Sequence, residues 1–130
     1  VPGENATVLR WQTRESSDGT FTEGIFLKGR VGDKKVRIFL DSGSRYNKVN
    51  AALLPDAPRV TMELQQGDIS RRLEVQQVPV CRGVETRVGD RTTRLNFVLT
   101  DRPDALLNFD FLRNTIFVLD YDRREIRIKR

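Results

Sequence analysis

One carboxylate in this 130-residue chain is placed where it could do chemistry. Asp41 follows an alternating apolar run, and Ser42 and Gly43 come directly after it. The alternation predicts a strand over residues 35–40 that is buried on both faces, and Asp-Ser-Gly favours a tight turn. Ending a buried strand in a carboxylate costs free energy unless a site uses the charge, so we interpret Asp41 as a candidate catalytic acid.

Hydrolysis by carboxylates alone uses two of them, one as general base for water and one as general acid. The chain holds a single Asp-Ser-Gly, so a competent site would need a symmetric dimer in which each copy gives one Asp41. In such a site Ser42 would hydrogen-bond across the carboxylate pair, and Gly43 would allow the two loops to approach closely. Ser44 could bond the outer carboxylate oxygen. The competing interpretation is an ordinary turn, because all three residue types favour turns.

The composition excludes other hydrolytic chemistries. The chain has no His, so it cannot build a Ser-His-Asp or Cys-His site by itself. Its one cysteine, Cys81, cannot supply a thiolate cage or an intrachain disulfide, and is most simply a small core residue. Asp120 and Asp122 together fall short of the oxygen ligands that calcium takes. We therefore expect no metal and no cofactor.

The net charge of +5 is spread along the chain, with its densest cluster at residues 123–130. Such charge supports weak attraction to acidic partners, but only Tyr121 lies near the cluster as a stacking aromatic. We therefore expect no nucleic-acid partner, and a small basic β-barrel that binds nucleic acid or an acidic partner is the weakest hypothesis. No apolar run approaches the length of a membrane span.

The chain begins with Val rather than Met, so we expect a mature or excised fragment of a longer precursor. The compartment stays open, with an extracytoplasmic or periplasmic location among the alternatives. The polar residues 1–20 are interpreted as an N-terminal arm. Trp11 either pins this arm to the body or marks a short first strand around residues 7–12. Residues 21–130 are then expected to form one domain.

Short strands separated by polar turns predict an all-β barrel or sandwich. Gln65-Gln66-Gly67-Asp68 predicts the tip of a hairpin. Only residues 109–114 are expected to be helical. The remaining expected strands cover residues 21–29, 60–64, 69–80, 84–88, 92–99, 116–119 and 125–129.

Two segments in this order resemble the retropepsin-like aspartic peptidases. Residues 40–49, Leu-Asp-Ser-Gly-Ser-Arg-Tyr-Asn-Lys-Val, are similar to that family's apolar-Asp-Thr/Ser-Gly-Ala/Ser pattern with a following aliphatic. Residues 106–112, Leu-Leu-Asn-Phe-Asp-Phe-Leu, resemble its aliphatic-aliphatic-Gly-x-Asp-Phe-Leu helix, with terminal strands after it. The resemblance spans about residues 21–130 and leaves out only the N-terminal arm.

This resemblance implies a small closed barrel with a flap hairpin and one short C-terminal helix. It implies a homodimeric endopeptidase that acts on peptide or protein substrates, with Asp41 catalytic and Ser42 and Gly43 supporting it. The flap that closes over the substrate would be formed by Gln66, Gly67 and Asp68.

One position departs from the family pattern. Asn108 stands where the family usually has Gly, and Asn tolerates unusual backbone angles less well than Gly. A catalytically inactive module that dimerises or binds peptide is therefore the alternative hypothesis. Asp110 matches the family's helix Asp or Asn and is interpreted as a capping or buried hydrogen-bonding residue.

Overall fold

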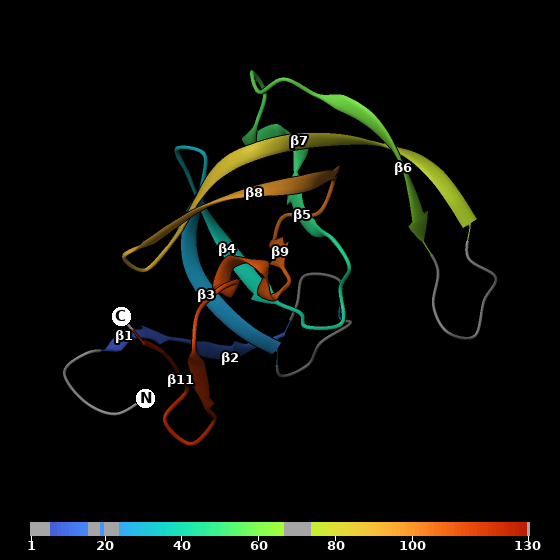
Figure 1. Ribbon diagram of the computed structural model, residues 1–130. Helices are drawn as coiled ribbons and strands as arrows, with labels where there is room; N and C mark the ends of the chain where they lie inside the picture. The colour runs from blue at the N-terminus through green and yellow to red at the C-terminus, as the bar shows by residue number, and fades with distance from the viewer. Residues whose placement is uncertain (1–5, 16–18, 20–23, 67–73, 130) are drawn as a thin grey trace.

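The computed structural model describes residues 6–15, 19, 24–66 and 74–129, and these residues are mostly strands (Figure 1). The fold is therefore all-β, as predicted. The helical elements of the described residues are two 3-10 helices, η2 (Ala51–Leu53) and η3 (Phe109–Leu112). The strands are β1 (Ala6–Arg10), β2 (Gln12–Arg14), β3 (Gly24–Val31), β4 (Lys34–Leu40), β5 (Asn47–Asn50), β6 (Val60–Gln66), β7 (Glu74–Val88), β8 (Arg91–Thr100), β9 (Ala105–Leu107), β10 (Phe117–Asp120) and β11 (Glu125–Lys129).

The large sheet has the strand order β2-β3-β4-β9-β5-β8-β7-β6. Strand β3 also pairs with β7, through Gly29↔Val88, Arg30↔Arg87 and Val31↔Thr86, so the sheet returns on itself (Figure 1). A Cβ on Gly29 would lie 2.5 Å from the carbonyl oxygen of Arg87. Glycine is therefore required where β3 and β7 meet.

Strand β4 runs through the middle of this sheet, between β3 and β9. Ile38 and Leu40 face the main core, while Phe39 on the opposite face is also buried and packs against Phe26 with ring centroids 6.0 Å apart. The prediction of a central strand buried on both faces is confirmed. Cys81 is a buried core residue with a free thiol, also as predicted.

Two sequence expectations about elements were wrong. Strands were expected separately over residues 69–80 and 84–88. Residues 69–73 lie outside the described residues, and β7 is continuous from Glu74 to Val88. Its register shifts between Cys81 and Val84, where Gly83 has φ 62° and forms a bulge rather than a turn.

The helix expected over residues 109–114 is only the short 3-10 helix η3. Arg113 leaves the helical region at ψ 140°, and Asn114 follows at φ 62°. The chain therefore turns away before an α-helical hydrogen bond can repeat.

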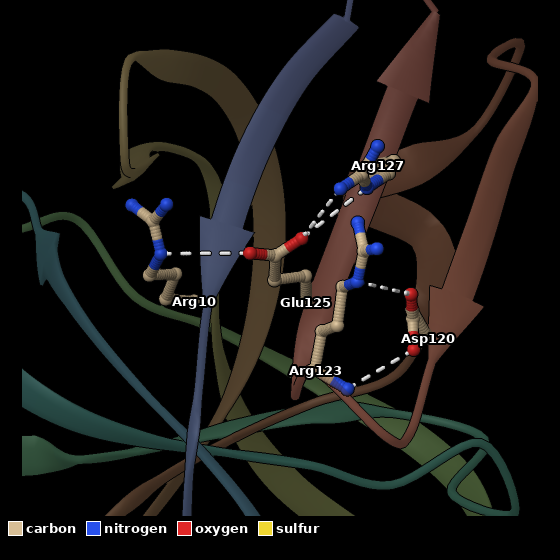
Figure 2. Close-up of polar contacts among 5 residues, drawn as sticks. All are labelled: Arg10, Asp120, Arg123, Glu125 and Arg127. Atoms are coloured by element: carbon tan, nitrogen blue, oxygen red, sulfur yellow. Dashed lines mark hydrogen bonds and ion pairs between the residues drawn. The ribbon is translucent and has the colours of Figure 1, made fainter. Parts of the chain in front are cut away.

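The second sheet, β1-β11-β10, joins the two ends of the chain. Figure 2 shows the carboxylate of Glu125 between Arg10, at 3.6 Å, and Arg127, at 3.1 Å. A third ion pair joins Arg123 to Asp120 in the turn before β11 (Figure 2). The Arg10–Glu125 pair and the antiparallel backbone pairing join β1 to β11, so part of the segment interpreted as an arm pairs with the body.

Trp11 is buried beside this sheet. Its backbone N–H donates to the carbonyl oxygen of Arg124 at 3.0 Å, and its ring packs edge-on against Tyr121.

The division of the chain at residue 20 stays a prediction. Among residues 6–15, 19, 24–66 and 74–129, no helix is long and apolar enough to cross a bilayer.

Candidate active site

The loop of residues 41–46 crosses the end of a strand that comes much later in the chain. It joins β4 to β5, and β9 lies between them, parallel to β4 and antiparallel to β5. Leu40 of β4 is in register with Leu107 of β9. The loop must therefore cross the end of β9, which places Asp41 at the edge of the sheet where these strands end.

Asp41 is fixed by three hydrogen bonds at this edge. Its N–H donates to the carbonyl oxygen of Leu107 at 2.8 Å, which continues the β4–β9 pairing by one residue. Its Oδ1 accepts from the N–H of Gly43 at 2.9 Å, and its carbonyl oxygen accepts from the N–H of Ser44 at 3.2 Å. The side chain is half-buried, so its carboxylate is oriented by the loop and still reaches the surface.

The neighbours of Asp41 lie in different environments. Ser42 and Gly43 are exposed at the tip of the turn, where a second molecule could approach them. The sequence suggested that Ser44 could bond the outer oxygen of the Asp41 carboxylate, but the structure shows a different bond. Its Oγ donates instead to the carbonyl oxygen of Tyr46 at 2.7 Å, because the loop curls back over it. Ser44 thus stabilises the loop rather than the carboxylate.

Asn108 ties the loop to η3. Its backbone N–H donates to Oδ1 of Asn47 at 3.0 Å, and its Nδ2 donates to the carbonyl oxygen of Arg45 at 3.3 Å. Its Oδ1 accepts from the N–H of Asp110 at 2.9 Å, so Asn108 is the N-cap of η3. Asn108 is only 8% exposed, and these bonds satisfy its buried polar atoms.

Asp110 was predicted to cap the helix or to be a buried hydrogen-bonding residue. This was wrong, because Asn108 is the N-cap of η3. Asp110 is partly exposed and its Oδ1 lies 3.2 Å from the guanidinium of Arg113. Sequence reasoning also missed Asn47, which is buried and whose Nδ2 donates to the carbonyl oxygen of Asn96 at 3.3 Å. The available signal was an amide side chain two positions before the aliphatic Val49, on the same face of a strand.

The proposed flap lies mostly outside the described residues. Gly67 and Asp68 fall outside them, and Gln66 is the last described residue of β6. The hydroxyl of Tyr46 lies 3.5 Å from the carbonyl oxygen of Gln65, so the end of β6 approaches the loop that follows Asp41. The hairpin therefore starts on the same side as the candidate catalytic residue.

A cleft of about 490 Å³ opens beside this loop. Arg45 and Tyr46 line it from the loop, Met62 and Leu64 from β6, and Asp110 from η3. Asp41, Ser42 and Gly43 do not line it. The cleft is therefore a neighbour of the candidate catalytic residue and not its immediate surroundings.

An ion pair fixes the entry to β9. The Nε of Arg37 lies 2.7 Å from Oδ1 of Asp104, and its guanidinium lies over the rings of Phe26 and Phe39 at 5.7 and 5.6 Å. The hydrogen bond to Asp104 raises the pKa of Arg37. The pair locks β4 to the residue before β9, and so helps to hold the strand that receives the N–H of Asp41.

Within the described part of the chain, no three His, Cys, Asp or Glu side chains gather as metal ligands. The acid–base chemistry that this site offers is that of one oriented carboxylate per chain.

No protein-family model matches the chain, and no curated protein does. Solved structures do. A crystal structure of a retropepsin-like aspartic protease from Rickettsia conorii matches with a TM-score of 0.55 and 13% identity, over 95% of this chain and 89% of that one. The chain has the retropepsin-like fold.

Two foamy virus structures share this retropepsin-like fold. The solution structure of simian foamy virus protease matches with a TM-score of 0.53 and 22% identity, over 67% of this chain and 90% of that one. A foamy viral protease-reverse transcriptase in complex with an RNA/DNA hybrid matches with a TM-score of 0.54 and 14% identity, over 67% of this chain. The match covers only 11% of that larger protein. At these identities the likeness concerns the fold.

Proposed function

We propose that this chain is an aspartic endopeptidase whose active site takes one Asp41 from each subunit of a homodimer. The observation that carries the proposal is the position of Asp41. On a retropepsin-like fold it ends the buried central strand, is bonded to β9, and has its carboxylate oriented by Gly43. One such carboxylate per chain is half of a two-carboxylate site.

In the proposed dimer the two Asp41 carboxylates share one proton. Like charges at hydrogen-bond distance do not both ionise easily, so one carboxylate stays ionised as the base for water while the other donates a proton to the substrate. Ser42 would bridge the pair, and exposed Gly43 lets the loops meet. The hairpin with Gln66, Gly67 and Asp68 would close over the peptide and exclude water.

Two features of the fold support this arrangement. The ring of pairings from β3 round to β7 supports a small closed barrel. In the three-stranded sheet, β1 and β10 are outer strands that have no further partner among the described residues. They and the adjoining segments carry exposed apolar side chains: Val8, Ile116, Val118 and Tyr121. Such an edge favours a second copy.

The alternative is a catalytically inactive module that dimerises or binds peptide, and it rests on Asn108. Its backbone has φ −81° and ψ −170°, extended values that any residue adopts. Asn at this position therefore imposes no backbone strain beneath Asp41, which favours the enzyme over the inactive module.

The test is cleavage of a diverse peptide library from about pH 3 to about pH 7 at several protein concentrations. The variant Asp41→Asn keeps the size of the side chain and removes its charge, and Asp56→Asn in an exposed loop is the matched control. We expect cleavage by the native protein and the control, rising faster than linearly with concentration, and none by Asp41→Asn. A folded dimer that cleaves nothing would support the inactive module.

A further inference from the structure

Basic side chains gather on one face of the β3–β4 hairpin, away from the candidate active site. In the register of the two strands, Lys28 is opposite Arg37 and Arg30 is opposite Lys35. Arg30 is also opposite Arg87 where β3 meets β7. Ile25, Leu27, Val36 and Ile38 alternate with these residues and face the core, so the basic side chains share the outer face.

Three like-charged pairs directly across neighbouring strands destabilise a sheet when nothing balances them. Within the described residues, neither Lys28 nor Lys35 has an ion-pair partner. Arg30 and Arg87 reach only backbone carbonyl oxygens, those of Asp33 at 3.5 Å and Gly89 at 3.0 Å. Arg37 alone of the group pairs with a carboxylate, that of Asp104. The arrangement is therefore suited to an anion from outside the fold.

The face is also hollowed. A groove of about 690 Å³ is lined by all five basic residues, with Phe26, Gly29, Val36 and Gly89 between them. No acidic residue lines it among those that the structure describes. A concave surface of one charge concentrates an oppositely charged ligand more strongly than a flat surface does.

We propose that this groove binds an extended acidic peptide segment of a partner protein. Alternate residues of a strand project on one face about 7 Å apart, which is the spacing of Lys28 from Arg30 and of Lys35 from Arg37. A peptide in extended conformation repeats its side chains with the same period, so Asp or Glu at every second position would meet these cations in register. Charge-assisted contacts of this kind carry the recognition.

Two other polyanions fit the groove less well. Single-stranded nucleic acid binds on exposed aromatic rings between basic residues, whereas Phe26, the one aromatic residue of the lining, is 7% exposed. An anionic bilayer presents a flat surface that cannot enter a groove. Lys35 lies six residues before Asp41, about 20 Å along β4, so the proposal does not depend on the proposed catalytic function.

The test measures fluorescence anisotropy of a labelled 12-residue peptide of alternating Glu and Ser, with alternating Gln and Ser as the neutral peptide. The double variant Arg30→Gln/Lys35→Gln removes two charges from the groove. Lys34→Gln/Arg82→Gln removes two charges from exposed residues outside its lining. We expect the first variant to lose about tenfold in affinity for the acidic peptide, the second less than about twofold. Lys28→Gln should reproduce part of the loss.

Equal losses in both double variants would show that only net charge matters and would overturn the proposal, as would equal binding of the two peptides. Two further probes are a labelled 12-nucleotide oligo(dT) and vesicles containing phosphatidylserine. If either bound more tightly than the acidic peptide, and lost that binding in Arg30→Gln/Lys35→Gln, the assignment to a peptide would be wrong. Circular dichroism establishes that each variant is folded.

Discussion

The side chain of Asn47 accepts a hydrogen bond from the backbone N–H of Asn108 at 3.0 Å, across 61 positions of the chain. Asn47 begins β5 and Asn108 caps η3, so one buried bond joins η3 to the strand that follows the loop of Asp41. The carbonyl oxygen of Arg45, within that loop, accepts from Asn108 as well. The position of the candidate catalytic residue therefore depends on a pair of asparagines.

Replacing Asn108 by the glycine typical of the family should destabilise the protein. Asn108→Gly removes the bonds to Arg45 and Asp110, and φ −81° gives Gly no conformational advantage. We expect a loss of about 1–3 kcal/mol in the free energy of unfolding, measured with urea. Asn114→Gly is the matched control, because Asn114 has φ 62° and Gly should be neutral or stabilising there. Equal losses in the two variants would contradict this account.

The close approach of β3 to β7 makes a sharper prediction. Gly29→Ala would place a Cβ 2.5 Å from a backbone oxygen and 2.6 Å from Cδ1 of Ile38. We expect it to lower the free energy of unfolding by about 3 kcal/mol. At Gly83 a Cβ meets nothing within 4 Å, although φ is 62°, so Gly83→Ala should cost only about 1 kcal/mol. The reverse order would mean that the sheet does not close through Gly29.

The ion pairs of Glu125 should stabilise the three-stranded sheet. Glu125→Gln leaves Arg127, which is mostly buried, without its carboxylate, while the pair with exposed Arg10 is largely screened by solvent. We expect a loss of about 1–2 kcal/mol in the free energy of unfolding. Glu63→Gln, on the exposed face of β6, should change it by less than about 0.5 kcal/mol. A loss no larger than that of the control would mean that backbone pairing alone stabilises this sheet.

The pair of Arg37 and Asp104 should show little pH dependence near neutrality. The pKa of Arg37 is raised in the folded protein. The contribution of the pair to stability is therefore complete below the pKa of Arg37 in the unfolded chain, and it is lost only as the pH rises through the pKa in the folded protein, in strongly alkaline solution. We therefore expect Asp104→Asn to lower the free energy of unfolding by about 1 kcal/mol, and by the same amount at every pH from about 6 to about 9. Asp101→Asn, at an exposed position, is the control. A difference that varied strongly over this range would assign the effect to another titrating group.

The sequence predicted the parts of the site that depend on local pattern. The alternation of β4 and the turn residues after it located Asp41 at a strand end, because period and turn chemistry act over a few residues. Strand β9 was missed: its three residues form a strand only because β4 and β5, more than 50 positions earlier, bind them on both sides. The bond between Asn47 and Asn108 was missed for the same reason.

Gly83 shows a different limit of prediction from the sequence. Glycine marks a turn and a bulge equally well in a sequence, and only the pairing of β7 with β8 on both sides of Gly83 distinguishes them. At Asn108 the sequence suggested a weakness where the structure has a stabilising contact. Its departure from the family pattern suggested strain, but its side chain forms the bonds that hold the loop.

The central claim is that one site uses Asp41 from two chains, and mixing subunits tests it most directly. Native protein and Asp41→Asn are unfolded together in equal amounts, refolded, and assayed for peptide cleavage at fixed total concentration. Random pairing leaves about a quarter of the dimers with two intact carboxylates. We predict about a quarter of the native activity, and full activity when Asp56→Asn replaces Asp41→Asn. Half of the native activity would mean that each chain acts with its own Asp41 alone, and would contradict the shared site.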